Sequence, residues 1–117
     1  MNRFKGLNDR VITWANAKGI LEKATSLAQI GKTEEEVEET KEALTAKSKN
    51  LAYYENSKGV ICDTEEEIAD GFGDILVTVL IGCKLQGLDP MDCLETALNV
   101  IEKRTGKMEG GTFVKDN

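Results

Sequence analysis

Six glutamates fall within the nine positions from 34 to 42, and one lysine, Lys41, lies among them. In an α-helix, residues three or four apart are neighbours, so Glu34 faces Glu38, and Glu38 in turn faces Glu42. Each such pair of like charges destabilises a helix by about a few tenths of a kcal/mol. Two explanations stay open: the run is a solvated helix face, or a cation that the sequence does not supply compensates it.

Length and charge limit what the chain can be. Its 117 residues suffice for one domain with a hydrophobic core but not for two, so we expect a single domain over residues 1–117. A net charge of -6 argues against binding to a nucleic-acid backbone, which requires a basic surface. The N-terminus lacks the apolar segment of a signal peptide, and the longest apolar stretch, 75–81, is too short to span a bilayer. We therefore expect a cytoplasmic protein.

The cysteines indicate neither a disulfide framework nor a zinc site. Cys62, Cys83 and Cys93 are odd in number and widely spaced, and the chain has no histidine to share a metal. We expect buried, reduced thiols.

Capping residues and apolar spacing predict two helices in the first half of the chain. Asn8 is expected to cap a first helix that ends near Gly19. Ser26 is expected to cap a long second helix that runs to about Lys47. Its apolar residues recur at nearly seven-residue steps and predict the buried stripe: Leu27, Ile30, Val37 and Leu44. The segment 48–63 is interpreted mainly as a connection, in which LAYY either extends the helix or forms a short turn.

Two further helices are predicted in the second half. Thr64 and Glu67 form a capping box for a third helix, which Gly87 stops. Its broad apolar surface is formed by Ile68, Phe72, Ile75, Leu76, Val79, Leu80 and Cys83. Asp89 and Pro90 start a fourth helix, whose core-facing residues are Leu94, Ala97, Leu98 and Ile101. Four helices without convincing strand alternation predict an all-α fold, a four-helix bundle with a short C-terminal arm or hairpin.

Acidic residues on the second and third helices are predicted to project toward a common space. Glu67, Asp70 and Asp74 fall within about 60° of one another, and their stripe leads into a segment that is apolar all round. Glu36 and Glu39 can flank the core from the second helix. Two such sets repel strongly in a low dielectric unless they are protonated or bridged by a cation. Mg²⁺ prefers oxygen ligands, so the pattern favours a magnesium site, with a solvated charge run as the alternative.

The sequence EEVEE, residues 35 to 39, resembles the EExxE motif of the MazG-like nucleoside triphosphate pyrophosphohydrolases, an all-α family in which a second helix supplies an ExxD motif. The resemblance continues through ITWANAKGI, DGFGDILVTVL and ALNVIEKRTGKMEGGTFVK, which covers nearly the whole chain. Over this length the chain resembles the compact members of the family, which are often met in phage genomes.

The chain departs from the family pattern at one position. If Asp74 corresponds to the Asp of ExxD, the position of the Glu is taken by Gly71. A literal ExxD lies one turn earlier, from Glu67 to Asp70, and Asp70 with Asp74 is an i, i+4 pair that can supply the same two oxygens. We favour Asp70 and Asp74 on this helix, with Glu67 in reserve.

The resemblance implies hydrolysis of a nucleoside or deoxynucleoside triphosphate to the monophosphate and pyrophosphate, with Mg²⁺ as cofactor and Mn²⁺ as a possible substitute. It implies catalytic roles for Glu35, Glu36 and Glu39, with Glu35 orienting or deprotonating the attacking water. The implied metal ligands are Glu35, Glu36, Glu39, Glu67, Asp70 and Asp74. Relatives commonly assemble by packing helices between subunits, so a homodimer or homotetramer is expected.

The candidates for substrate binding are Lys32, Asn99, Lys103, Arg104, Lys107 and Trp14. The basic residues that follow the fourth helix either complement its dipole or contact phosphates. Trp14, the only tryptophan, is either a core residue or a platform on which a base stacks.

A rival from another class is a non-enzymatic acidic helical protein, such as a phage-type DNA mimic whose carboxylates imitate phosphates. A mimic spreads its acids over a convex face, whereas a hydrolase converges them on a pocket. The predicted convergence of the two acidic sets favours the hydrolase.

Overall fold

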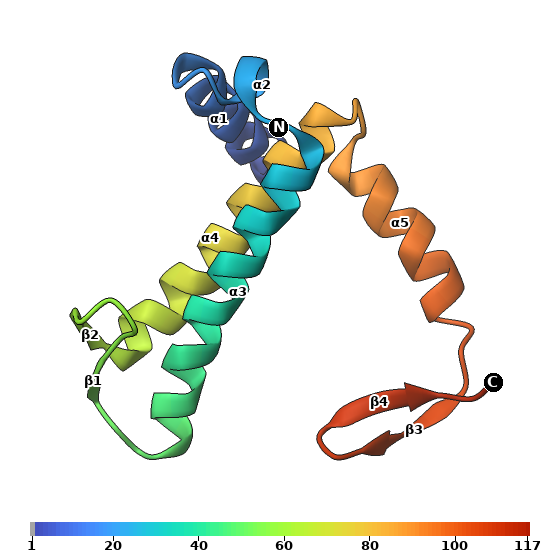
Figure 1. The fold of residues 1–117 in the computed structure, drawn as a ribbon. Helices are drawn as coiled ribbons and strands as arrows, with labels where there is room; N and C mark the ends of the chain where they lie inside the picture. The colour runs from blue at the N-terminus through green and yellow to red at the C-terminus, as the bar shows by residue number, and fades with distance from the viewer. Residues whose placement is uncertain (1) are drawn as a thin grey trace. The chain divides into compact units, whose positions relative to one another are not determined.

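A computed structural model describes residues 2–117, which form two compact units, one that ends at Gly87 and one that begins at Leu88 (Figure 1). The first unit contains α1 (Arg3–Ala17), α2 (Ile20–Lys23), α3 (Ser26–Ser48), β1 (Tyr53–Glu55), β2 (Ile61–Asp63) and α4 (Thr64–Leu85). The second contains α5 (Pro90–Ile101), β3 (Gly106–Glu109) and β4 (Thr112–Lys115). The prediction of an all-α four-helix bundle is therefore wrong: the described residues form five helices and two small antiparallel sheets.

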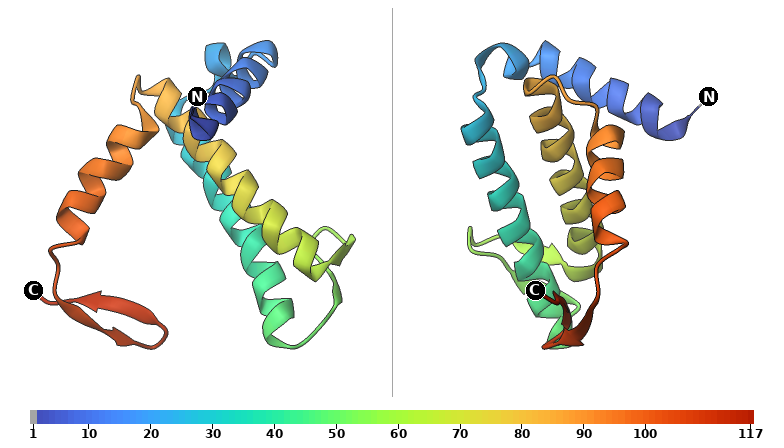
Figure 2. Two further views of the ribbon diagram at one scale, coloured as in Figure 1. Left: turned by 180° about the vertical axis from the view of Figure 1, so that it is seen from behind. Right: turned by 90° about the vertical axis from the view of Figure 1, so that its right-hand side faces the viewer.

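Helices α3 and α4 run antiparallel, side by side, through the first unit (Figure 2). Near one end, Gln29 Nε2 donates to the Thr78 carbonyl oxygen at 3.1 Å. Near the other end, Lys47 Nζ lies 3.0 Å from Glu65 Oε1. The buried side chains along the pair are mostly small or polar: Gln29, Thr40, Ala43 and Ala46 on α3, and Thr64, Gly71, Thr78 and Ile81 on α4. Close approach and hydrogen bonds, rather than large apolar side chains, hold this pair together.

The prediction that the apolar stripe of the second helix is buried is wrong. Val37 and Leu44 are 44% and 42% exposed, and Leu27 and Ile30 are more exposed still. At 100° per residue, this stripe lies roughly a quarter turn round α3 from the residues that contact α4. The apolar surface predicted for the third helix is exposed at Phe72, Leu76 and Val79, and its other four residues are half-buried. Because the helices are antiparallel, both apolar stripes lie on the same side of the pair.

The N-terminal helix begins earlier than predicted. Asn2 is its cap, with Oδ1 accepting from Phe4 N at 2.9 Å, whereas Asn8 lies inside the helix. Helix α1 ends two residues before Gly19, and the one-turn α2 that follows was not predicted. Thr25, rather than Ser26, caps α3.

The connection predicted for 48–63 contains an antiparallel hairpin instead. Tyr54 of β1 lies opposite Cys62 of β2, and the hairpin leads directly into α4. Asp63 caps α4 through its Oδ1, which accepts from Glu66 N at 3.0 Å, and Thr64 is the buried first residue of the helix. The predicted capping box was thus one residue out of place.

The second unit begins as predicted. Asp89 Oδ1 accepts from Met91 N at 2.7 Å, and Pro90 occupies the first helical position. The tail forms the hairpin that was one of its two predicted alternatives, and both turn glycines, Gly110 and Gly111, have positive φ. The burial expected for the apolar face of α5 is not found, since none of the helix residues is buried.

The described cysteines form no disulfide. Cys62 is buried, whereas Cys83 and Cys93 are half-buried, so full burial was correct for one thiol of the three. Within residues 2–117, no helix has both the length and the apolar character that crossing a membrane requires.

Candidate functional site

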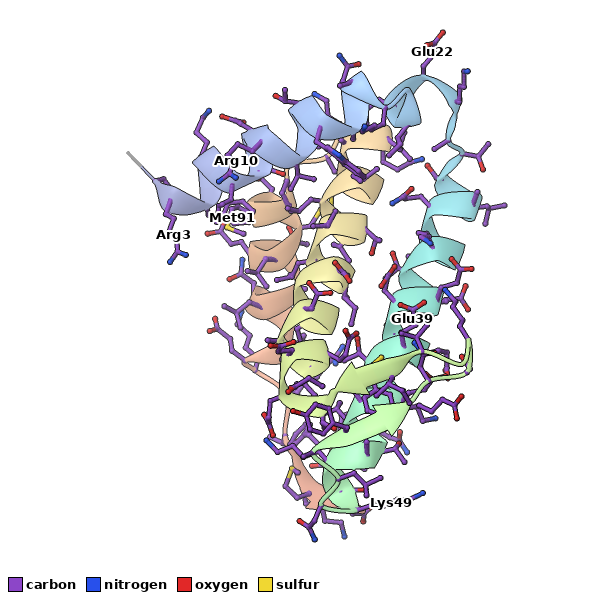
Figure 3. The ribbon with its side chains drawn as sticks, turned by 90° about the vertical axis from the view of Figure 1, so that its left-hand side faces the viewer. Arg3, Arg10, Glu22, Glu39, Lys49 and Met91 are labelled. Atoms are coloured by element: carbon purple, nitrogen blue, oxygen red, sulfur yellow. The ribbon has the colours of Figure 1, made fainter. Side chains whose placement is uncertain are left out.

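Carboxylates from α3 and α4 gather on the side of the helix pair opposite the apolar stripes. On α3, 13% of the Glu36 side chain is exposed, and 44% of the Glu39 side chain is exposed. Across the pair, Glu67 and Asp74 are half-buried and Asp70 is exposed. Figure 3 labels Glu39 on α3, beside the β1–β2 hairpin. We call these five residues the acidic cluster.

The electrostatics of Glu36 link the two helices. Burial raises the pKa of Glu36 above its ordinary value of 4.5, and the charges of Glu39 and Asp74 raise it further. Lys32 opposes this effect without reversing it. A carboxylate of α4 therefore lies near enough to destabilise the charge on a carboxylate of α3.

The two half-buried acids of α4 experience the same repulsion. Burial, followed by the charge of Asp70, raises the pKa of Asp74 above 3.8, and Glu39 of α3 adds to it. Burial also raises the pKa of Glu67 above 4.5, with Asp70 and Asp74 as the next causes. The acidic cluster is thus a strained group of like charges rather than a set of separate surface carboxylates.

Within the acidic cluster, neighbouring carboxyl groups of one helix affect each other: Glu39 raises the pKa of Glu36 on α3, and Asp70 raises the pKa of Asp74 on α4. Across residues 2–117, however, no three acidic or cysteine side chains converge closely enough to hold a metal ion as they stand. A shared cation would require rotation of these side chains toward one another.

Gly71 lies where α3 and α4 pack against each other. A Cβ built on Gly71 would collide with the Thr40 hydroxyl, because α3 and α4 approach closely here. A glutamate at this position would extend into α3 and not toward the acidic cluster.

Two lysines border the acidic cluster. Lys32 Nζ lies 3.1 Å from Glu35 Oε2 and 4.0 Å from Glu36 Oε1. This predicted substrate-binding residue therefore lies beside the acidic cluster. Glu35 itself is 64% exposed and makes its ion pair outside the cluster. Lys58, which was not among the predicted site residues, lies 3.2 Å from Glu39 Oε1. The turn signal Asn-Ser-Lys-Gly could have identified a hairpin tip there, but not its contact with α3.

Trp14 lines a groove between α1 and α4. The groove has a volume of about 990 Å³ and is largely apolar, with Leu7 of α1 and Leu80 of α4 among its walls. Arg10 contributes a charged group, and Asp74 of the acidic cluster also lines it. Trp14 is 49% exposed, so the core interpretation of this residue is wrong. The groove and the acidic cluster adjoin at Asp74.

The remaining predicted ligands belong to the second unit. Asn99 lies on α5, Lys103 and Arg104 follow it, and Lys107 lies on β3 with its Nζ 3.3 Å from Glu109 Oε1. The structure brings Lys32, Trp14 and the acidic cluster into one region of the first unit.

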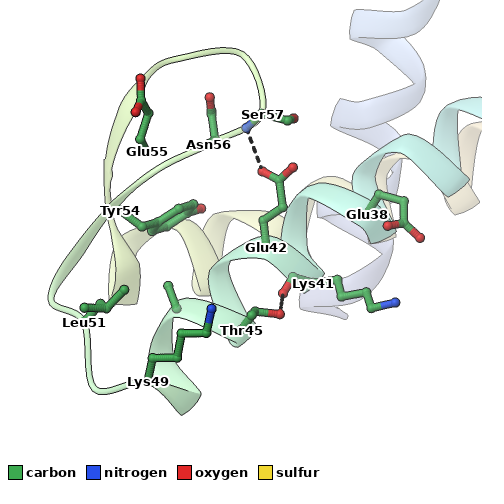
Figure 4. A pocket seen from close by; sticks show the side chains of 11 residues that line it. Glu38, Lys41, Glu42, Thr45, Lys49, Leu51, Tyr54, Glu55, Asn56 and Ser57 are labelled. Carbon is green, nitrogen blue, oxygen red and sulfur yellow. Dashed lines mark hydrogen bonds between the residues drawn. The ribbon is translucent and has the colours of Figure 1, made fainter.

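A second, smaller pocket of about 600 Å³ lies between α3 and the β1–β2 hairpin (Figure 4). Tyr54 projects into it from β1, and Glu42 and Thr45 line it from α3. Glu42 Oε2 accepts a hydrogen bond from Ser57 N at 3.3 Å, which fastens the tip of the hairpin to the helix. None of the predicted site residues lines this pocket.

Comparison of the chain with protein-family models, with curated proteins and with solved structures gave no match. The resemblance to the MazG-like enzymes therefore rests on the motifs quoted above.

The raised pKa values predict how stability depends on pH. In the folded chain Glu36, Glu67 and Asp74 bind protons more tightly than in the unfolded chain, where their pKa values are near 4.5 and 3.8. By linkage, the free energy of unfolding falls as pH rises through the folded-state values and recovers on acidification. Without metal, we expect the Tm to be higher at about pH 5 than at about pH 7.

Thermal unfolding of the Asp74→Asn variant tests this cause. Because the variant cannot ionise at position 74, its Tm should change less between the two pH values than that of the wild type. Equal changes in the two proteins would show that other groups control the pH dependence.

Proposed function

We propose that the chain is a Mg²⁺-dependent hydrolase that cleaves nucleoside or deoxynucleoside triphosphates to the monophosphate and pyrophosphate. The observation that carries the proposal is the mutual repulsion of Glu36, Glu39 and Asp74 across two helices. Such an arrangement costs stability without a cation, which a merely solvated acidic face would avoid by spreading its charges. The resemblance of EEVEE, residues 35 to 39, to the EExxE motif supports a role for these repelling carboxylates as ligands of the metal.

The donor set fits magnesium by its chemistry. The acidic cluster offers only carboxylate oxygens, the ligands that Mg²⁺ prefers, and no nitrogen or sulfur that would favour zinc. Glu36, Glu39, Asp70 and Asp74 would hold the metal, with Glu67 in reserve, and Mn²⁺ would be accepted as well. When bound, the metal neutralises phosphate charge and lowers the pKa of a coordinated water.

The other residues bind and orient the substrate. Glu35, exposed at the edge of the acidic cluster, would orient or deprotonate the attacking water. Lys32 would contact a phosphate, and Asn99, Lys103, Arg104 and Lys107 of the second unit stay predicted substrate-binding residues. Trp14 would stack on the base in the groove, which adjoins the acidic cluster at Asp74 and has the size of a small-ligand site.

We further propose that the chain works in the cytoplasm as a homodimer or homotetramer. The exposed apolar stripes of α3 and α4 lie on one side of the pair, and a contiguous apolar surface of this kind marks an interaction site. Packing between subunits would cover it and leave the acidic cluster open on the opposite side. Light scattering in solution should give the mass of two or four chains, and the mass of one chain would contradict this proposal.

The deciding experiment incubates the folded protein with each nucleoside and deoxynucleoside triphosphate, with and without Mg²⁺. We expect release of pyrophosphate rather than orthophosphate, only when the metal is present. Because Trp14 is the only tryptophan, intrinsic fluorescence should also report base binding. Folded protein that releases no pyrophosphate from any nucleotide would overturn the proposal and favour the DNA-mimic alternative.

A further inference from the structure

The tip of the β1–β2 hairpin is a tightly built turn. Asn56 Oδ1 accepts from Lys58 N at 2.9 Å and from Val60 N at 3.0 Å, and Asn56 N donates to the Val60 carbonyl oxygen at 2.9 Å. Gly59 takes the positive φ, 78°, that such a reversal requires. These bonds define the backbone on both sides of Lys58.

The tip is also fastened to α3. The hydrogen bond from Ser57 N to Glu42 holds the backbone immediately before Lys58 against the helix. Lys58 Nζ then reaches Glu39 Oε1, one helical turn closer to the N-terminus of α3. The turn is thus held by its own hydrogen bonds and by its hydrogen bond to α3. It places the ammonium group of Lys58 beside Glu39 of the acidic cluster.

Stability does not explain this ion pair. The Lys58 side chain is 74% exposed and that of Glu39 is 44% exposed, and exposed pairs of this kind contribute little to folding. The pair does occupy a carboxylate that the proposed function assigns to the metal. A cation that binds the acidic cluster must therefore compete with Lys58 for Glu39.

We propose that Lys58 is a substrate-positioning residue that exchanges Glu39 for a phosphate of the bound nucleotide. This inference rests on the proposed function and adds to it a residue from the hairpin. Without ligand, the ammonium group neutralises part of the charge of the acidic cluster. Once a cation takes Glu39, the ammonium group is released at the edge of the site, where an anionic phosphate is its natural partner.

If Lys58 exchanges partners in this way, removing its charge should change the affinities for Mg²⁺ and for the nucleotide in opposite directions. Removing the charge at position 58 removes a competitor for Glu39, so Mg²⁺ alone should bind more tightly, by about 3-fold or more. The same change removes a phosphate contact, so the nucleotide should bind more weakly, by about 10-fold. A residue that only supported the fold would shift both affinities in the same direction.

The test compares Lys58→Gln with Lys47→Gln. Lys47 forms a similarly exposed pair with Glu65, on the same helix pair but outside the acidic cluster, and serves as the matched control. Calorimetry measures binding of Mg²⁺ alone, and fluorescence of Trp14 measures binding of a non-hydrolysable nucleotide with Mg²⁺. We expect the opposite shifts in Lys58→Gln, no shift in Lys47→Gln, and near-normal values in Lys58→Arg, which keeps the charge.

Each failure has a distinct signature. A wild type that binds both ligands but releases no pyrophosphate would overturn the proposed function and leave the exchange itself to be decided by the two affinities. An active wild type whose Lys58→Gln variant keeps both affinities, or changes them in the same direction, would overturn this inference alone. A wild type that binds neither ligand would overturn both.

Discussion

Replacing Glu36 by Gln should reduce kcat by about 100-fold or more, while the metal-free chain becomes as stable as the wild type or more stable. Gln keeps the size of the side chain and removes the charge that Glu39 and Asp74 oppose. The proposed metal would lose a ligand, whereas the helix would lose a repulsion. Glu39→Gln should behave in the same way. Pyrophosphate release and thermal unfolding, each measured with and without Mg²⁺, check the two halves of this prediction.

Glu34→Gln is the matched control for these two variants. Glu34 lies on the same helix and is exposed, outside the acidic cluster, so its replacement should leave kcat unchanged. If Glu36→Gln and Glu39→Gln both kept full turnover, these residues could not be the proposed ligands. If both lost turnover and also stability, the loss of activity would have a structural cause instead.

The sequence predicted features that depend on a few neighbouring residues. The cap of α5 needs only Asp89 followed by Pro90, and both occupy the predicted positions. The arc of acids on the third helix depends only on helical periodicity, so Glu67 and Asp74 were expected to share a side, and the charge of Asp74 does raise the pKa of Glu67. Features of this kind are set locally and can be recognised without knowledge of the fold.

The contact between α3 and α4 could not be predicted in the same way. Periodicity located the apolar stripe of Val37 and Leu44 but could not tell which element covers it, and α4 instead packs on the polar side of α3. Thr40 and Gln29 carry no hydrophobic signal, so their burial becomes visible only when the opposing helix is present. This error placed Glu36 at the edge of the packed face, although its side chain is far less exposed than those of Glu35 and Glu39.

The hairpin was missed because each of its strands has only three residues. A segment so short shows no reliable alternation, and the Asn, Ser and Gly at its tip suit any connection. The contact of Lys58 with Glu39 joins residues 19 positions apart through that tip. No local pattern connects them, so this part of the candidate site required the structure.

The largest expected loss of stability follows from Gly71. In a Gly71→Ala variant the new methyl group would meet the hydroxyl, Cβ and Cγ2 of Thr40, so the helices must separate or Thr40 must rotate. The hydroxyl of Thr40 also donates to the Glu36 carbonyl oxygen at 2.8 Å, which restricts that rotation. We expect the free energy of unfolding to fall by about 1–3 kcal/mol, measured by denaturant titration.

Gly73→Ala separates this close contact from the general effect of removing a helical glycine. A Cβ on Gly73 would meet nothing within 4 Å, so this variant should gain about 0.5–1 kcal/mol from the better helix propensity of alanine. Adding Thr40→Ala to Gly71→Ala should recover part of the loss, because it removes two of the three clashing atoms. Equal effects of Gly71→Ala and Gly73→Ala would mean that the helices are not closely packed at Thr40.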